Sequence, residues 1–213
     1  GVVGPDQFIE LLEQNGTIVE VGAWVLDQAC RQARIWSDQG RSINVSVNVS
    51  GRQLEGGTLV EQVQDALERH GVAPTSLTIE ITESTLMRDT TVARDQLQAL
   101  KGIGVKIAID DFGTGHSSLG YLRQLPVDSI KIDRSFITGM SDSREGKALI
   151  HTLVQLGKAL NLETVAEGIE ERAQLTRLQA EQCDSGQGFL FARPLAPEAI
   201  ERFFESRDSA PVR

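Results

Sequence analysis

From residue 43 onward, short apolar segments rich in β-branched residues alternate with longer amphipathic segments. The short segments predict strands at 43–49, 77–82, 105–110, 128–132, 162–166 and 185–190. The amphipathic segments predict helices at 58–70, 90–101, 117–124, 144–160, 170–180 and 197–205. Strands that alternate with helices at this spacing are typical of βαβ units and a mostly parallel sheet.

The number of strand–helix units falls short of a closed barrel, which has eight strands. Residues 5–15 and 19–38 both show helical periodicity, so they do not supply the missing strands. We therefore expect the first one or two strands to lie upstream of Gly1, which we interpret as a cut end because the chain does not begin with Met. The predicted fold is an α/β barrel of the TIM (β/α)8 type that lacks these strands. An open doubly wound sheet is the structural alternative.

Composition limits the class of protein and its partners. With 213 residues, of which 40% are hydrophobic and 24% charged, the chain fits one soluble domain over residues 1–205, followed by a flexible tail at 206–213. The net charge of −9 argues against a nucleic-acid polymer as partner, because such contact needs a basic face. An acidic protein can still bind a phosphorylated small molecule if metal ions supply positive charge locally.

The cysteines and the hydropathy indicate a cytoplasmic domain. Cys30 and Cys183 lie far apart with no metal-type spacing, so we expect reduced thiols. No apolar run approaches the roughly 18 residues that span a bilayer, so this chain is expected to make no direct membrane contact. A longer parent protein could be membrane-anchored through upstream segments.

The segment IAIDDFGTGHSSL, residues 107–119, is the strongest functional signal. A buried strand ends in Asp110 and Asp111, and Gly113 and Gly115 follow, where glycine permits backbone angles that other residues avoid. Two acids at the mouth of a buried strand suit a hard cation that takes several oxygen ligands, and the glycine loop could close over the bound group. The structural alternative is a pair of acids that caps the next helix.

Each predicted strand carries an ionisable or amide residue near its carboxyl end. These residues are Asn48, Glu80, Asp110 with Asp111, Lys131, Glu167 and Gln187. Taken singly, several have local explanations as turn formers, surface charges or helix-start acids. Their equivalent places in successive units favour one site, since barrel enzymes place their chemistry at this end. Three carboxylates and an amide would ligate Mg²⁺ or Mn²⁺, and a lysine with a further glutamate would suit a metal-bound water that attacks a phosphodiester.

Two residues near these positions have competing interpretations. His116, in the loop after the acids, could act as an acid or base, but a packing role is favoured because the metal ligands are complete without it. Glu83 could cap the following helix, or it could accept hydrogen bonds from the 112–116 loop and hold that loop in place.

From Gly1 to about Phe204 the chain resembles the EAL domain, the family of cyclic-di-GMP phosphodiesterases. The matching stretches are FIELLEQNG, VGAWVLDQACRQ, VNVSGRQL, IEITES, IDDFGTGHSSLGYLRQLPVDSIKIDRSFI, TVAEGIE and CDSGQGFLFARPL. The resemblance implies a modified barrel with one early antiparallel strand, two divalent cations (Mg²⁺ or Mn²⁺), and hydrolysis of cyclic-di-GMP to linear pGpG in bacterial signalling.

The resemblance also implies a role for each site position. It makes Asn48, Glu80 and Asp110 metal ligands and places Asp111 on the second metal. Lys131 contacts the attacking water, Glu167 is a base or supports the second metal, and Gln187 orients water and ligand. Glu83 braces the loop that contains Gly113, Thr114 and Gly115, and Glu170 is a further acid of the site.

The sequence departs from the family pattern in two places. His116 stands where the family usually has Tyr. The Glu-Ala-Leu signature, whose glutamate is a metal ligand, is absent and is expected upstream of Gly1, so this chain is predicted to be weakly active or inactive.

The alternatives are a catalytically inactive EAL domain that acts as a cyclic-di-GMP receptor or protein-interaction module, and another metal-dependent barrel hydrolase. The resemblance further implies a homodimer and a GGDEF or sensor domain upstream.

Overall fold

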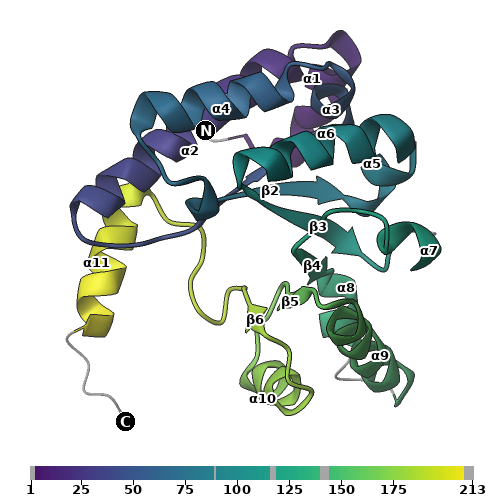
Figure 1. Ribbon diagram of the computed structural model, residues 1–213. Helices are drawn as coiled ribbons and strands as arrows, with labels where there is room; N and C mark the ends of the chain where they lie inside the picture. The colour runs from purple at the N-terminus through teal and green to yellow at the C-terminus, as the bar shows by residue number, and fades with distance from the viewer. Residues whose placement is uncertain (1–2, 89, 116–118, 140–143, 209–213) are drawn as a thin grey trace.

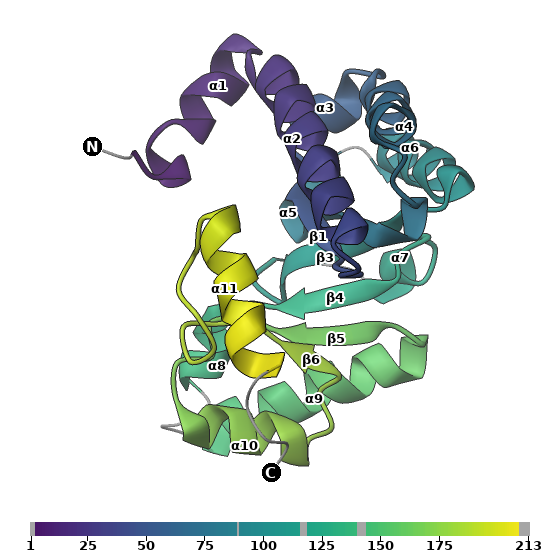
Figure 2. The same cartoon turned by 90° about the vertical axis from the view of Figure 1, so that its left-hand side faces the viewer.

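The computed structural model describes residues 3–88, 90–115, 119–139 and 144–208 (Figure 1). Its centre is one sheet of six parallel strands in the order of the sequence, curled into a half-barrel (Figure 2). The strands are β1 (Val45–Asn48), β2 (Leu77–Thr82), β3 (Lys106–Phe112), β4 (Ser129–Ile132), β5 (Glu163–Ala166) and β6 (Ser185–Gly186).

Helices lie in the connections between successive strands. Among the described residues, two further helices precede the first strand, and the last helix returns toward the second of them (Figures 1 and 2). The longer helices are α1 (Ile9–Asn15), α2 (Ile18–Asp38), α4 (Leu59–His70), α6 (Thr90–Ile103), α9 (Arg144–Leu160), α10 (Arg172–Ala180) and α11 (Pro197–Asp208). The shorter ones are α3 (Gly51–Glu55), α5 (Glu83–Arg88), α7 (Leu119–Leu122) and α8 (Arg134–Gly139), with 3₁₀ turns at Pro5–Gln7 and Pro74–Ser76.

The core lies between the convex face of the sheet and the helices. Successive side chains of a strand point to opposite faces, so each strand contributes residues to both sides. On the convex side, Ile79, Ile107 and Ile130 are fully buried. On the concave side, small or polar residues such as Thr78, Ala108 and Ser129 line a cavity of about 370 Å³. The polar interior of the half-barrel is therefore separated from the apolar core by the sheet itself.

The last helix contacts the segment that follows α2. Gln39, which follows α2, donates a hydrogen bond from Nε2 to Oε1 of Glu201 on α11 over 3.2 Å. The guanidinium carbon of Arg41 lies 5.3 Å from the centre of the Phe204 ring, within range of a cation–π contact. Helix α11 is thus attached to the end of α2, beside the open side of the half-barrel (Figure 2).

The predicted fold, a partial barrel of the TIM type, is confirmed. The predicted strand at 185–190 is wrong in length, because only Ser185–Gly186 pair with β5. Beyond them Gly188 adopts a φ of +157° and lies against the backbone of Ile169, so the chain turns instead of extending. Helices α3, α5 and α8 were not predicted, since elements this short show no hydrophobic periodicity.

The ends of some elements also differ from the prediction. Of the helix expected at 117–124, α7 covers Leu119–Leu122, and 117–118 lie outside the described residues. Helix α11 extends to Asp208, into the segment expected as a tail, whose residues 209–213 are not described. Both cysteines are free, as expected. Among the described helices, none combines the length and apolar character needed to cross a membrane.

Candidate active site

The polar residues predicted from the sequence come from neighbouring strands at one end of the sheet. The register pairs Asn48 of β1 with Glu80 of β2, and Thr82 of β2 with Asp110 of β3. Glu167 directly follows β5, and Gln187 directly follows β6. Because all strands are parallel, these residues share the carboxyl edge of the sheet, where barrel enzymes carry their sites.

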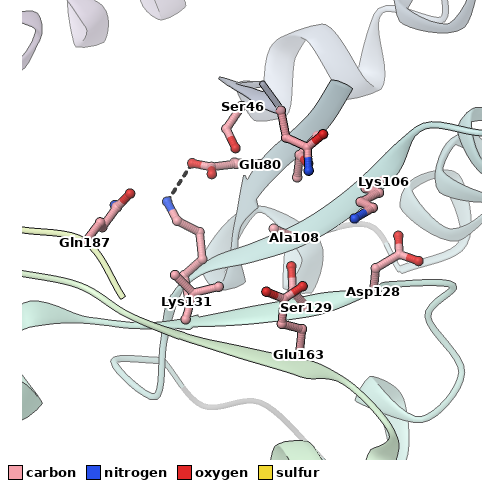
Figure 3. Close-up of a pocket in the computed structure, with 12 residues that line it drawn as sticks. Ser46, Glu80, Lys106, Ala108, Asp128, Ser129, Lys131, Glu163 and Gln187 are labelled. Atoms are coloured by element: carbon pink, nitrogen blue, oxygen red, sulfur yellow. Dashed lines mark hydrogen bonds and ion pairs between the residues drawn. The ribbon is translucent and has the colours of Figure 1, made fainter. Parts of the chain in front are cut away.

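The ammonium of Lys131 is the centre of this arrangement. Its Nζ lies 2.5 Å from Oε2 of Glu80, 2.9 Å from Oδ1 of Asp110 and 2.6 Å from Oε1 of Glu167. Figure 3 shows the lysine extending from β4 toward Glu80 across the concave side. Only 4% of Lys131 and 7% of Glu80 is exposed. Buried charges are costly unless they are paired, and here three carboxylates share one ammonium, which leaves an excess of negative charge.

Asp110 and Asp111 both face the site although they are adjacent in a strand. Neighbouring strand residues ordinarily point to opposite faces. Here the pairing of β3 with β4 shifts register between Ile109 and Phe112, and Asp111 adopts a left-handed φ of +53°. The backbone N–H of Asp111 donates to Oδ1 of Asp110 over 3.0 Å. This irregularity re-aims the second carboxylate.

A group that could hold a metal ion follows from this geometry. One carboxylate oxygen each from Asp110, Asp111 and Glu167 lie within 4.8 Å of one another. Carboxylate oxygens are the ligands that Mg²⁺ and Mn²⁺ prefer, so the residues present fit a hard divalent cation. The carboxylate of Glu80 lies beside this group, because it binds the same Lys131 ammonium as Asp110 and Glu167. The register of β1 and β2 places Asn48 beside Glu80.

The charges of the site shift its pKa values. Burial raises the pKa of Glu167, and the charges of Asp110 and Glu80 add to this, while the hydrogen bond to Lys131 opposes it. Burial likewise raises the pKa of Asp111, helped by the charges of Asp110 and Asp133. For Lys131 burial lowers the pKa, but hydrogen bonds to Glu167 and Glu80 outweigh it and the net shift is upward. An excess of carboxylates over ammonium groups is a setting that a cation stabilises.

The glycine loop after Asp111 is braced by Glu83. The backbone N–H of Gly113 donates to Oε2 of Glu83 over 2.7 Å, and a Cβ at Gly115 would come within 2.6 Å of Oε1 of the same side chain. Thr114 donates from its hydroxyl to the backbone oxygen of Asp111 over 2.8 Å. Glu83 is only 2% exposed. The alternative in which Glu83 holds the loop is therefore the one that the contacts favour, although Glu83 is also the first residue of α5.

Gln187 is connected to Glu167 and to the chain beyond β5. Its Nε2 donates to Oε1 of Glu167 over 2.7 Å, and its backbone oxygen accepts from the N–H of Ile169 over 3.0 Å. Gln187, Glu167, Asp111 and Glu170 line a cavity of about 680 Å³ at the strand ends, which we call the strand-end cavity. Its remaining lining is partly aromatic, with Phe189, Phe203 and Phe204.

The structure also brings residues to the site that the sequence reasoning missed. Asp133 and Arg134 line the strand-end cavity, and the charge of Asp133 raises the pKa of Asp111. The sequence did carry a signal for Asp133, because it is an acid that comes directly after a buried strand. His116 lies outside the described residues, so its predicted packing role stays a prediction.

A parallel half-barrel with carboxylates, a lysine and an amide at its strand ends is the arrangement of a metal-dependent enzyme built on a (β/α) barrel. The chain belongs to the EAL domain family, whose model matches residues 1–194. The predicted family is thus confirmed.

Curated relatives extend this comparison. The chain is 46% identical over 201 residues to the bifunctional diguanylate cyclase/cyclic di-GMP phosphodiesterase MucR of Pseudomonas aeruginosa, covering 94% of this chain and 29% of that protein. It is 41% identical to the cyclic di-GMP phosphodiesterase NbdA of the same organism, covering 99% of this chain and 27% of that protein. The chain therefore spans less than a third of the length of these relatives.

Solved structures share the fold. The PaMucR phosphodiesterase in a c-di-GMP complex superposes with a TM-score of 0.91 at 46% identity, covering 94% of this chain and 81% of that one. The EAL enzyme Bd1971 with cAMP and cyclic-di-GMP bound has a TM-score of 0.90 at 33% identity, covering 95% of this chain and 56% of that one.

Proposed function

We propose that this chain is the phosphodiesterase domain of a bacterial signalling protein and that it hydrolyses cyclic-di-GMP to linear pGpG, lowering the level of this second messenger. The observation that carries the proposal is the cluster of Asp110, Asp111 and Glu167 around Lys131 at the strand ends. The chain has this cluster within a fold shared with relatives that are named cyclic di-GMP phosphodiesterases.

The proposed cofactors are two Mg²⁺ or Mn²⁺ ions. Asn48, Glu80 and Asp110 would hold one ion, and Asp111 would hold the other, with Glu167 in support. The bound metal supplies positive charge for the phosphate and lowers the pKa of water. The donor set agrees with this choice, since every proposed ligand offers an oxygen atom.

The reaction breaks one phosphodiester bond. A water oxygen adds to phosphorus, and the bond from phosphorus to the ribose 3′ oxygen breaks, so that pGpG keeps a 5′ phosphate and the 3′ oxygen takes up a proton. Lys131 contacts the attacking water, and its ammonium holds the carboxylates of Glu80, Asp110 and Glu167 around the reacting group. Glu167 accepts the proton of that water, a task that its raised pKa favours. Gln187 holds Glu167 in orientation through its 2.7 Å hydrogen bond.

Several other expectations remain part of the proposal. Glu83 supports the loop of Gly113–Gly115, and Glu170 lines the strand-end cavity beside the carboxylates. We further propose a cytoplasmic location, a homodimer, and a GGDEF or sensor domain upstream in a longer parent protein, as the bifunctional name of MucR suggests for that relative.

The test is hydrolysis of cyclic-di-GMP with Mg²⁺ or Mn²⁺, followed by chromatography of pGpG. It is run on this chain and on a chain extended upstream by the length of two strands and their connection, which the barrel prediction requires. We expect turnover in the extended chain that is lost in Glu80→Ala and Asp110→Ala but retained in the surface control Asp65→Asn. Binding without turnover in the extended chain would instead identify a receptor.

A further inference from the structure

We propose that the first turn of α8 acts as a spacer that fixes the distance between the loop after β3 and the loop after β5, and that Phe136 is its main positioning residue. This inference rests on the proposed function, because those two loops follow Asp111 and Glu167. The turn begins three residues after Lys131, so one short segment reaches three parts of the site.

On the β3 side, the spacer touches the glycine loop through an aromatic ring. A Cβ built at Gly113 would lie 2.9 Å from Cε2 and 3.0 Å from Cζ of Phe136, so the ring lies directly against the glycine backbone. Gly113 has a φ of +98°, and its N–H donates to Glu83. The loop is therefore held by both Glu83 and Phe136.

On the β5 side, the same turn touches the backbone that follows Glu167. Gly168 has a φ of +69°, and a Cβ there would lie 2.4 Å from Cβ and 3.4 Å from Cα of Arg134. No side chain larger than hydrogen fits between the two segments without a shift. Gly168 therefore lets the chain after Glu167 lie directly on the first residue of α8.

Hydrogen bonds hold the start of the spacer together. Asp133 caps it, because its Oδ1 accepts from the backbone N–H of Ser135 over 3.0 Å and from the Ser135 hydroxyl over 2.5 Å. The N–H of Phe136 donates to the backbone oxygen of Asp133 over 3.1 Å. Because this capped turn touches both Gly113 and Gly168, it fixes the positions of the two loops relative to each other.

The relative position of the two loops matters because a divalent cation tolerates little displacement of its ligand oxygens. Mg²⁺ needs oxygens at about 2.0–2.1 Å in near-ideal geometry. Asp111 lies near the end of β3 and Glu167 directly follows β5, yet their oxygens belong to one group within 4.8 Å. Residues behind metal ligands typically change affinity by about 10–100-fold when they are replaced. The spacer is the structural element that sets this separation.

The first test compares Phe136→Ala with the control Phe8→Ala, another half-buried phenylalanine at the start of α1. Binding of Mn²⁺ to the metal-free chain, extended upstream as in the test of the proposed function, is measured by calorimetry, and folding by circular dichroism. We expect Phe136→Ala to bind Mn²⁺ about tenfold or more weakly, while Phe8→Ala binds like the unsubstituted chain. Phe136→Leu, which keeps much of the volume, should recover most of the affinity.

The second test concerns the contact between α8 and the loop after β5. Gly168→Ala is compared with Gly57→Ala, since both glycines have a positive φ but nothing lies within 4 Å of a Cβ at Gly57. Both substitutions place alanine at a similar positive φ, +69° at Gly168 and +73° at Gly57. If only Gly168→Ala loses Mn²⁺ affinity, the loss is due to the contact with Arg134.

The outcomes separate this inference from the proposed function. No Mn²⁺ binding by the unsubstituted extended chain, which should include the signature glutamate, would refute the proposed metal site. Binding by that chain with equal affinity in Phe136→Ala and Gly168→Ala would overturn the spacer alone. If Phe136→Ala does not fold, Phe136→Leu and Gly168→Ala decide, and unfolding of all three would also overturn the inference, because the turn would then support the whole domain rather than the site.

Discussion

The Nζ of Lys131 lies 2.6 Å from Oε1 of Glu167, and the two residues come from the ends of the adjacent strands β4 and β5. The same oxygen accepts from Gln187 over 2.7 Å. Glu167 is therefore held from two sides, with its raised pKa set by burial and by neighbouring acids. A carboxylate that is oriented by two donors and has a raised pKa suits a proton acceptor.

Replacement of the lysine should abolish most of the activity. Lys131→Met leaves Glu80, Asp110 and Glu167 without their shared ammonium, and we expect turnover to fall about 10²–10⁴-fold. The measurement is kcat at saturating Mn²⁺ in the extended chain. Lys106→Met, a lysine that lines the cavity of about 370 Å³ on the concave side, serves as the control and should retain turnover. Equal rates in the two variants would contradict the role of Lys131.

Loosening the glycine loop should weaken the site without unfolding the domain. Glu83→Gln removes the negative charge that accepts from the N–H of Gly113, and such charge-assisted bonds are about twice as strong as neutral ones. We expect kcat to fall about tenfold, in the range seen for residues behind metal ligands. The exposed Glu61→Gln on α4 is the control. A thermal melt should show both variants folded, and unchanged kcat in Glu83→Gln would mean that the loop needs no brace.

Replacement of a helical glycine by alanine should change stability in opposite directions at Gly157 and Gly102, because only Gly157 packs closely against a neighbouring element. A Cβ at Gly157 would overlap Cγ2 of the buried Thr164, so Gly157→Ala should destabilise the domain by about 1–3 kcal/mol. Nothing lies within 4 Å of a Cβ at Gly102 on α6, so Gly102→Ala should stabilise it by up to about 1 kcal/mol. Urea unfolding of both variants measures these changes, and a stabilising Gly157→Ala would show that α9 can move away.

Low pH should weaken the hydrogen bonds between Asp184, which precedes β6, and Thr164 of β5. Asp184 accepts from the N–H of Thr164 over 2.8 Å and from its hydroxyl over 2.7 Å. Burial raises the pKa of Asp184, but these hydrogen bonds outweigh it and the net shift is downward. A lowered folded-state pKa contributes stability above the unfolded pKa of about 3.9, and this is lost as the pH falls through the folded value.

The variant Asp184→Asn isolates that effect. It keeps an acceptor oxygen but cannot titrate, so it should be less stable than the unsubstituted chain at pH 7 and should approach it below about pH 4. Urea midpoints at both pH values give the comparison, with the exposed Asp65→Asn as the control. A gap that is as wide at pH 3 as at pH 7 would rule out titration of Asp184 as the cause.

The strand ends that carry the site could be predicted from the sequence, because the alternation of strands and helices and the place of each polar residue are local patterns. Glu80 and Asp110 illustrate this, since each lies in an apolar strand near its carboxyl end. The shift in register that turns Asp111 toward Asp110 could not be predicted, because it depends on how β4 pairs with β3. Contacts between distant loops were also out of reach, such as Arg134 against Gly168.

Each strand of the sheet pairs only with strands that are its neighbours along the chain. During synthesis, every new strand can therefore dock on an edge that has already emerged, without waiting for a distant partner. Asn48, Glu80, Asp110, Lys131, Glu167 and Gln187 would join in that order. The growing chain thus carries a cluster of acids whose mutual repulsion is reduced when Lys131 is added, and it gains the amide that orients Glu167 only when β6 is added.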